Sequence, residues 1–281
     1  MNEPRTVAIV QARMGSTRLP GKVLANIAGA PILLRVVERA AAARSIDDVV
    51  VATTIEPIDD PIERLCTSAS VSCYRGSEGD VLDRLQKASR AADAEIIVRI
   101  TSDCPLIDGE EIDLCVSHLR SSRGTSDEWD FVTNRLPPPW PRTYPIGLDV
   151  ECCSRQALER AVQEATMPHH REHVMPYIYE NARISRHSGG ATAESEVTGM
   201  AAFRILVLDL SEDLGAIRWT VDTVEDLTVV RGIYETLSPS TMFSWREALE
   251  AAISRPGLLA LNASTPQRHV HDIDERFRSE K

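Results

Sequence analysis

The sequence predicts an α/β fold, a doubly wound and mainly parallel sheet with helices on both faces and an inserted β arm. Two observations predict this fold. Short runs rich in valine and isoleucine alternate with segments whose apolar residues recur at helical spacing. The strand cores are almost continuously apolar, as expected when helices cover both faces of a parallel sheet. Ligands bind beyond the carboxyl ends of the strands in such sheets, so functional residues are expected there.

The regular alternation of strands and helices occupies residues 1–120. The strands are predicted at Val7–Gln11, Asp48–Thr54, Ser72–Arg75 and Glu95–Ile100. The helices are predicted at Pro31–Ala43, Asp59–Ser68, Asp80–Ala92 and Glu110–Leu119. Proline is favoured at the first position of a helix and aspartate at its cap, which fits Pro31 and Asp80.

The middle of the chain breaks this pattern. Leu136–Pro141 reads LPPPWP and cannot form regular structure, because proline has no backbone N–H. Tyr144–Glu151 is predicted as a strand that leaves the main sheet, within an inserted arm at about 136–185. Later strands are predicted at Arg204–Asp209 and Arg218–Val221, and later helices at Ser154–Ala165, Thr223–Leu237 and Trp245–Ser254. We predict a single domain over residues 1–260, followed by a polar tail over residues 261–281.

The composition excludes several classes of protein. With 281 residues, 43% hydrophobic and 26% charged, the chain is globular in composition. Its formal net charge of -11 repels nucleic acid and anionic lipid, so we expect neither nucleic-acid nor membrane binding. A signal peptide and an apolar run of about 20 residues are both missing, so a cytoplasmic location is expected. The six cysteines form no Cys-x-x-Cys pair and are expected to be reduced core residues.

A basic glycine-containing loop follows the first predicted strand. Gln11–Val23 reads QARMGSTRLPGKV and places three cations among two glycines. Backbone N–H groups in such loops cradle phosphate oxygens, and arginine and lysine neutralise their charge. The spacing fits neither a Walker A motif nor Gly-x-Gly-x-x-Gly. The segment therefore indicates a phosphate-binding loop of another type.

This loop resembles that of a known enzyme family. The string QARMGSTRLPGK is similar to the signature loop of the cytidylyltransferases that activate sugar acids, the ketodeoxyoctonate and acylneuraminate enzymes, and is most similar to their spore-coat polysaccharide branch. The resemblance implies a Rossmann-like nucleotidyltransferase fold and a loop that binds the CTP triphosphate. It implies nucleotide binding by Gln11, Ala12, Arg13, Gly15, Ser16, Arg18 and Lys22, with catalytic roles for Arg13, Arg18 and Lys22.

Two aspartates follow predicted strands. Asp103 comes after the strand that ends at Ile100, and Asp222 closes Arg218–Val221. Carboxylates at strand ends suit a Mg²⁺ ion shared with a triphosphate, although an aspartate there also serves as a helix cap or turn residue. The segments SDCPLID and WTVDTVEDL resemble those that carry the metal ligands in the same family. The resemblance implies that Asp103 and Asp222 are catalytic and bind Mg²⁺. The family commonly has glycine where this chain has Ser102.

The resemblance also implies contacts with the cytosine base. The turn before the helix at Asp80–Ala92 corresponds to a stretch that lies against the nucleotide, which implies that Gly76, Ser77 and Asp80 line the base side. Thr101 is expected to face the base as well. The alternative for the turn is an ordinary capped helix start.

The segments expected near the acceptor are less distinctive. Tyr144–Glu151 resembles the acceptor segment of the family, which implies acceptor binding by Tyr144, Gly147, Asp149 and Glu151. Asp149 and Glu151 would share one face of a strand, or be surface carboxylates. Arg-Glu-His-Val resembles the same branch, which implies that Arg171 and His173 contact the acceptor anion or a partner subunit; a structural role at a helix start is equally open.

The histidine-rich segment around these residues has a second interpretation. Residues 169–173 formally match the His-x-x-Glu-His pattern of inverted zinc peptidases. Flanking prolines and the missing downstream ligand argue against a peptidase.

The sequence as a whole predicts Mg²⁺-dependent transfer of CMP from CTP to an anionic small-molecule acceptor, with release of pyrophosphate. A sugar acid, a sugar or polyol phosphate and a phosphonate all fit as acceptors. The alternatives are a nucleotide-sugar glycosyltransferase, which typically shows an Asp-x-Asp motif, a transferase that uses another nucleoside triphosphate, and a non-catalytic regulator. The resemblance implies a homodimer.

Overall fold

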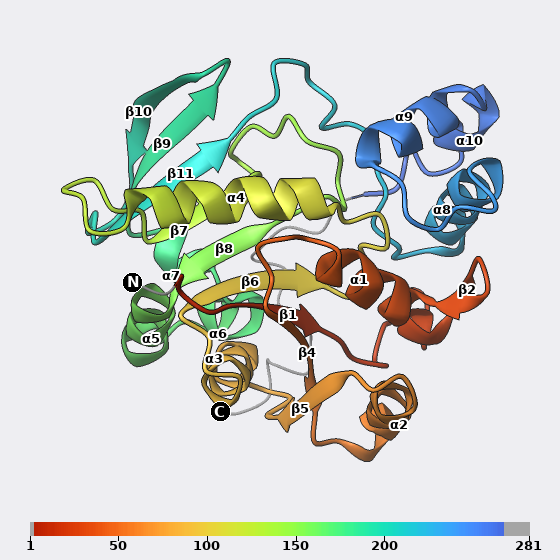
Figure 1. Cartoon of the computed structure of the whole chain (residues 1–281), viewed down its shortest axis with the longest axis horizontal. Coiled ribbons are helices and arrows are strands. Elements are labelled where there is room, and N and C mark those ends of the chain that lie inside the picture. The colour runs from red at the N-terminus through yellow and green to blue at the C-terminus, as the bar shows by residue number, and fades with distance from the viewer. Residues whose placement is uncertain (1–2, 267–281) are drawn as a thin grey trace.

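A nine-stranded mixed sheet forms the centre of the computed structural model, which describes residues 3–266 (Figure 1). The strand order is β10-β9-β11-β7-β8-β6-β1-β4-β5. The strands are β1 (Thr6–Gln11), β4 (Asp48–Thr54), β5 (Ser72–Gly76), β6 (Ile96–Thr101), β7 (Phe131–Thr133), β8 (Glu151–Ser154), β9 (Ala182–Ser188), β10 (Ala191–Val197) and β11 (Phe203–Leu208). A small second sheet pairs β2 (Asn26–Ile27) with β3 (Ala30–Pro31).

The direction of the strands confirms the predicted, mainly parallel α/β sheet. Strands β5, β4, β1 and β6 are mutually parallel, while β8 runs antiparallel to both β6 and β7. Gln11 lies opposite Ala52 on one neighbour and Thr101 on the other. The carboxyl ends of these strands therefore meet at one edge, where ligands of such sheets bind.

Alternating side chains of the strands pack into two separate cores. On β1, Ala8 and Val10 belong to one core, and Val7 and Ile9 belong to the other. The first core is covered by α1 (Ile32–Ala41), α2 (Asp60–Ser68), α4 (Gly109–Ser122), α8 (Val224–Thr236), α9 (Trp245–Ile253) and α10 (Pro256–Ala260). The second is covered by α3 (Val81–Ala91), α5 (Arg155–Glu164) and α7 (Pro176–Tyr179), and α6 (Pro168–His173) packs on α3. The doubly wound arrangement follows from this two-sided burial.

The predicted helices occur with small shifts at their ends. Pro31 is the residue before α1 rather than its first residue. The Asp80 carboxylate caps α3 by accepting a hydrogen bond from the Asp83 backbone N–H at 2.9 Å. Thr223 and Asp226 form a reciprocal capping box at the start of α8.

The predictions of two strands, at Tyr144–Glu151 and at Arg218–Val221, are wrong. Tyr144–Glu151 and Arg218–Val221 meet in a single parallel bridge between Ile146 and Arg218, and the regular strand begins only at Glu151. Pro145 has no N–H to donate, and Gly147 has φ +104°, so the extended run is interrupted there. These segments still lie together, since the Ile146 carbonyl accepts from the Trp219 N–H at 2.7 Å.

The stretch predicted as an inserted arm, residues 136–185, contributes to the main sheet. It contains β8, which lies between β6 and β7, together with α5, α6, α7 and the start of β9. Strands β9 and β10 form the hairpin at the far end of the sheet (Figure 1). Of the predicted polar tail at 261–281, residues 267–281 lie outside the described residues.

Two other expectations concern cysteines and membranes. All six cysteines are free thiols; Cys73 is half-buried and the other five are buried. Across the described residues 3–266, each helix is too short or too polar to cross a bilayer.

Candidate active site

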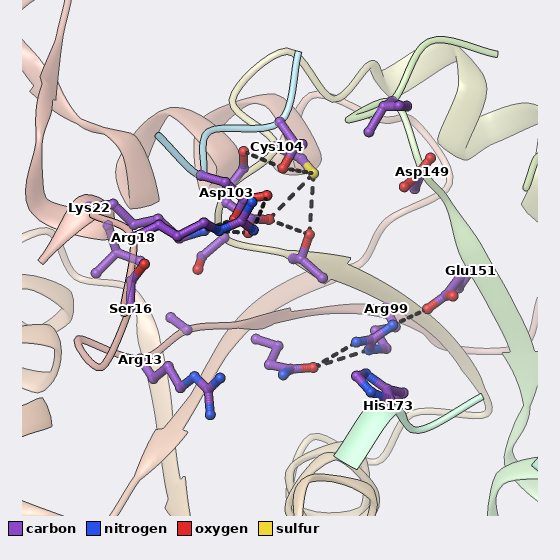
Figure 2. Close-up of a pocket in the computed structure, with 18 of the residues that line it drawn as sticks. Arg13, Ser16, Arg18, Lys22, Arg99, Asp103, Cys104, Asp149, Glu151 and His173 are labelled. Carbon is purple, nitrogen blue, oxygen red and sulfur yellow. Dashed lines mark hydrogen bonds and ion pairs between the residues drawn. The ribbon is translucent and has the colours of Figure 1, made fainter. Parts of the chain in front are cut away.

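A cavity of about 330 Å³ opens at the carboxyl edge of the central strands (Figure 2). Two groups of residues on and around its lining face each other across the cavity. The loop half consists of the loop Gln11–Lys22 together with Thr101, Asp103 and Asp222. The opposite half consists of Arg99, Arg135, Asp149, Glu151, His173 and Tyr179.

Backbone hydrogen bonds hold the loop in its shape. The Met14 carbonyl accepts from the Ser16 N–H at 2.8 Å and from the Gly21 N–H at 3.1 Å, which closes the loop on itself. The Met14 N–H in turn donates to the buried Asp59 carboxylate at 2.7 Å. Gly21 has φ +68°, a conformation that favours glycine, and starts the short 3-10 helix η1 (Lys22–Leu24). The loop thereby presents Lys22 toward the end of β6.

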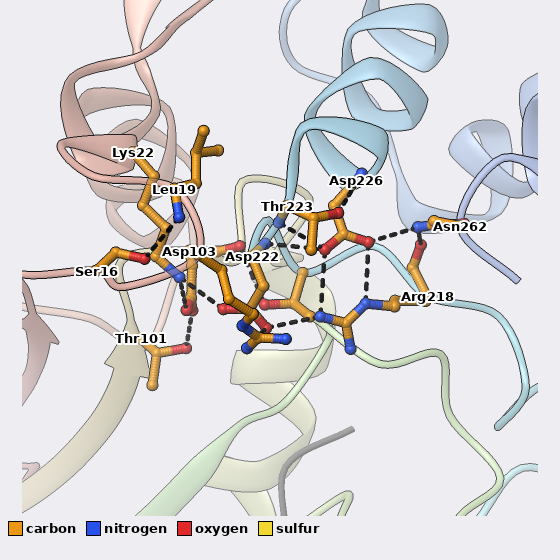
Figure 3. A network of polar contacts seen from close by, with 12 residues as sticks. Ser16, Leu19, Lys22, Thr101, Asp103, Arg218, Asp222, Thr223, Asp226 and Asn262 are labelled. Atoms are coloured by element: carbon orange, nitrogen blue, oxygen red, sulfur yellow. Dashed lines mark hydrogen bonds and ion pairs between the residues drawn. The ribbon is translucent and has the colours of Figure 1, made fainter. Parts of the chain in front are cut away.

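Three side chains from distant parts of the sequence meet at one point of the loop half (Figure 3). The Lys22 ammonium donates to Asp103 at 2.7 Å and to Asp222 at 2.8 Å. The Arg18 guanidinium lies 2.9 Å from the other oxygen of Asp222. The Val221 N–H donates to the Asp103 carbonyl at 2.8 Å, so the backbone itself places the two aspartates side by side.

The charges in this cluster reinforce one another. Burial alone would lower the pKa of Lys22, but attraction to Asp103 and Asp222 outweighs burial and raises that pKa above its ordinary value. Burial alone would raise the pKa of Asp103, but the Lys22 ammonium and the Thr101 hydroxyl lower it to about 2. Lys22 is therefore protonated and Asp103 ionised at neutral pH.

A buried network supports Asp222 from behind (Figure 3). Arg218 donates to Asp222 at 2.6 Å and to the fully buried Asp226 at 2.9 Å. Asp226 also accepts from the Asp222 N–H at 3.0 Å. Asn262 donates to Asp226 at 2.8 Å and to the Arg218 carbonyl at 3.0 Å. Each buried charge thus has partners, as low-dielectric surroundings require.

The opposite half is built from paired charges. Arg99 on β6 donates to the Gln11 side chain at 3.1 and 3.0 Å and forms an ion pair with Glu151. Arg135 lies 3.6 Å from Glu151 and 3.4 Å from Asp149. The cations of this half are therefore oriented by carboxylates before any ligand binds.

His173 carries a polar atom with no protein partner in the described chain. Its Nε2 is buried and accepts or donates no hydrogen bond within residues 3–266. Burial, followed by repulsion from Arg99, lowers the pKa of His173 to about 4, so the ring is neutral at neutral pH. Because His173 lines the cavity, a ligand can supply the missing hydrogen bond (Figure 2).

Most of the residues singled out from the sequence gather in this cavity. Those on its lining are Gln11, Ala12, Arg13, Gly15, Ser16, Arg18, Lys22, Thr101, Asp103, Asp149, Glu151, His173 and Asp222. Ser102, which replaces the family glycine, is also on the lining and is nearly buried. Figure 2 shows the loop cations on one side, with Asp149, Glu151 and His173 across from them.

Six other predicted residues lie away from this lining. Gly76 and Ser77 border a separate depression beside the ends of β4 and β5. Asp80 caps α3 and pairs with Arg171, which lies 3.0 Å away, so these two residues join α3 to α6.

Tyr144 and Gly147 lie behind the cavity wall. Tyr144 is buried, with its ring near Trp245. Gly147 packs on the backbone of Thr220 and lets Ile146 reach the cavity.

Several site residues were not predicted from the sequence. Arg99, Arg135, Tyr179 and Arg218 all line the cavity. Arg99 offers a signal, because a single charge inside the buried run EIIVRI requires a polar partner. Arg135 and Tyr179 offer none, since only the tertiary fold brings them to the cavity.

A basic loop that meets two carboxylates at the carboxyl edge of a parallel sheet defines the class of the protein, an α/β nucleotidyltransferase. The family model described as cytidylyltransferase matches residues 7–230. The chain therefore belongs to the cytidylyltransferase family and is an enzyme of that class.

Related sequences match most of the chain. An uncharacterized protein of Methanocaldococcus jannaschii is 32% identical over 273 residues, which cover 96% of this chain and 100% of that protein. The spore coat polysaccharide biosynthesis protein SpsF of Bacillus subtilis is 29% identical over 234 residues, covering 81% of this chain and 85% of the relative.

Solved structures agree with this assignment. A cytidylyltransferase of Leptospira borgpetersenii is 30% identical, with a TM-score of 0.79 over 95% of this chain and 100% of that chain. CMP:2-keto-3-deoxy-manno-octonic acid synthetase, solved in complex with CTP, is 18% identical and shares the fold, with a TM-score of 0.56 over 82% of this chain and 98% of its own.

Proposed function

We propose that this enzyme transfers CMP from CTP to an anionic small molecule and releases pyrophosphate, with Mg²⁺ held by Asp103 and Asp222. One observation carries the proposal: the cations of the glycine loop and the two carboxylates converge on one point, with Lys22 within 2.8 Å of both aspartates. The site thus combines groups that bind a triphosphate with groups that bind its counter-ion.

The carboxylates suit a hard divalent cation. Oxygen atoms of Asp103 and Asp222 both contact the same positive centre, the Lys22 ammonium, so their arrangement already accommodates a cation. Carboxylate oxygens are the protein ligands that Mg²⁺ prefers, usually one or two together with phosphate oxygens. When bound there, Mg²⁺ would neutralise charge that develops on the triphosphate.

The residues of the loop half would position CTP for transfer. Arg18 and Lys22 would hold the triphosphate oxygens, and the loop N–H groups would cradle them. An acceptor oxygen forms a new bond to the α-phosphorus, the bond from that phosphorus to the bridging oxygen breaks, and pyrophosphate leaves with that oxygen. Transfers of this kind depend on positioning and charge neutralisation rather than on a covalent enzyme intermediate.

The opposite half would bind the acceptor. Arg99, Arg135 and the open Nε2 of His173 offer groups for an anion and for hydroxyls. An acceptor that attacks through a carboxylate or phosphate oxygen is ionised at neutral pH and needs no strong base. The names of the relatives, which mention a keto-deoxy sugar acid and spore-coat polysaccharide, favour a sugar acid in polysaccharide biosynthesis.

Pyrophosphate release tests the proposal directly. The full chain is assayed with Mg²⁺ and each of CTP, UTP, ATP and GTP, against sugar acids, sugar and polyol phosphates, and phosphonates. We expect CTP-selective release with one acceptor class, loss of release on removal of Mg²⁺, and loss in Asp103→Asn. The control Asp127→Asn changes a carboxylate that is 71% exposed and far from the site, and should retain activity.

Two outcomes would contradict the proposal. Equal release from all four nucleotides would remove the preference for cytosine. No release with any pair, together with no CTP binding by calorimetry, would favour a non-catalytic regulator. A homodimer and a cytoplasmic location remain predictions, and light scattering at assay concentration measures the first.

A further inference from the structure

A second group of ligating side chains lies outside the cavity, where α6 meets α7. His169 and His170 lie near the start of α6, and Glu180 directly follows the last residue of α7. The Nε2 atoms of both histidines contact the Glu180 carboxylate, His169 at 3.1 and 3.2 Å and His170 at 2.8 Å. The two imidazole rings are 4.1 Å apart between centroids, so both turn toward the same carboxylate.

The geometry of this group matches a tetrahedral metal ion. One ligand atom from each of the three side chains lies within 4.8 Å of the others. An ion with bonds of about 2.0 Å in tetrahedral geometry holds its ligand atoms about 3.3 Å apart. The nitrogen–oxygen distances of this group, 2.8 to 3.2 Å, are close to that spacing. Two imidazoles and one carboxylate form a donor set that binds Zn²⁺ in proteins and that it shares with Fe²⁺, and the near-tetrahedral spacing favours Zn²⁺.

The burial of the group leaves room for a further ligand. Both histidines are buried, whereas the side chain of Glu180 is 29% exposed. The site is thus closed on the histidine side and open to water on the carboxylate side. This pattern provides three protein ligands and one solvent position.

The charge of Glu180 is balanced by no guanidinium or ammonium group within residues 3–266. Glu180 caps the carboxyl end of a helix, where a negative charge gains nothing from the helix dipole. Within residues 3–266, its ion-pair partners are the two imidazoles and include no lysine or arginine. A cation between the three groups would balance that charge.

The group is also linked to the cavity by the chain itself. His173 is the last residue of α6 and Tyr179 the last of α7, and both line the opposite half. An ion that joins the start of α6 to the end of α7 would fix the short helices that carry these two residues. This set differs from the zinc peptidase pattern at residues 169–173, because His173 lies on the cavity and Glu180 completes the group.

We propose that His169, His170 and Glu180 form a Zn²⁺ site that ties α6 to α7 and holds the His173 and Tyr179 wall of the cavity in place. The site lies outside the cytidylyl-transfer site and does not depend on which acceptor the enzyme uses.

Zinc titration of the untagged full chain tests this site. Bound metal is removed with a chelator, the chelator is removed, and Zn²⁺ is titrated by calorimetry in the presence of Mg²⁺. We expect one equivalent of Zn²⁺ and a rise in melting temperature. Glu180→Gln keeps the size of the side chain but removes its charge, and His170→Gln removes one imidazole. Both should weaken binding at least about 100-fold, since loss of even an indirect ligand partner weakens metal affinity by 10- to 100-fold.

Controls separate this site from other metal-binding groups. His118→Gln alters another histidine pair, whose rings are 5.1 Å apart, and should leave Zn²⁺ affinity unchanged. Asp103→Asn should also leave it unchanged, and Co²⁺ in place of Zn²⁺ should give the visible spectrum of a tetrahedral ion that Glu180→Gln abolishes. Absence of stoichiometric binding by the wild type would overturn the proposal. Binding that survives in folded Glu180→Gln and His170→Gln, or that is lost in Asp103→Asn, would overturn it too.

Discussion

The two halves of the cavity are built in different ways. The loop half draws its cations from one continuous segment, whose backbone is closed on Met14 and anchored to Asp59. The opposite half takes single side chains from β6, from the segment before β8, and from α6 and α7. The cations of the loop half therefore depend on local sequence, whereas its two aspartates and the opposite half depend on tertiary packing.

The largest expected effect comes from Lys22 in the loop half. Lys22→Ala removes the cation between Asp103 and Asp222, and we expect kcat to fall about 10²- to 10³-fold, as when one preorganised charge donor is lost. Steady-state pyrophosphate release measures this change. Lys87→Ala, which removes a lysine that is 57% exposed on α3, should leave kcat unchanged. If Lys22→Ala raised only the KM for the acceptor and left kcat unchanged, Lys22 would belong functionally to the opposite half of the cavity.

Gly147 tests how the two halves are joined. A Cβ atom added at Gly147 would lie only 2.5 Å from the Thr220 backbone nitrogen. The backbone there also has φ +104°, a conformation that favours glycine. Strain and overlap together should make Gly147→Ala about 3 kcal/mol less stable to unfolding.

Urea unfolding of Gly147→Ala and Gly190→Ala gives the comparison. Gly190 has φ +83° but no atom within 4 Å of the added carbon, so its replacement should cost only about 1 kcal/mol. Equal losses in both variants would show that close packing at Gly147 is unimportant.

His173 provides the smallest predicted effect, a pH dependence from the opposite half. Its folded pKa of about 4 lies below the ordinary 6.5, so the unfolded chain takes up a proton first as the pH falls. The stability contributed by neutral His173 is present above about pH 6.5 and is lost progressively down to about pH 4. Between pH 7 and pH 4.5, wild type should lose about 2 kcal/mol more stability than His173→Gln. Urea unfolding of both proteins at both pH values measures this difference. If wild type and His173→Gln lost the same unfolding free energy between pH 7 and pH 4.5, this contribution would be disproved.

The burial of a strand affects how well the sequence predicts it. Strands β1, β4 and β6 were predicted within about two residues, because their apolar runs are buried on both faces. Strand β5 was predicted equally well, although none of its residues is buried. Strand β10 was missed because all of its residues are exposed, so its sequence carries no apolar pattern.

The same reasoning applies to the site. Lys22, Asp103 and Asp222 were singled out because the loop motif and the segments SDCPLID and WTVDTVEDL resemble those of a known family. Arg135 and Tyr179 are brought to the cavity by a turn and a short helix whose placement depends on contacts distant in sequence. Patterns in a single sequence do not encode such contacts.

The hydrogen bonds of Asn262 have a consequence for the order in which the site is assembled. The ribosome synthesises the glycine loop, which ends at Lys22, well before it reaches Asn262. Before that moment, Arg218 and Asp226 lack the amide that joins them behind Asp222. A growing chain therefore carries the glycine loop before the contacts that support Asp222 from behind can form.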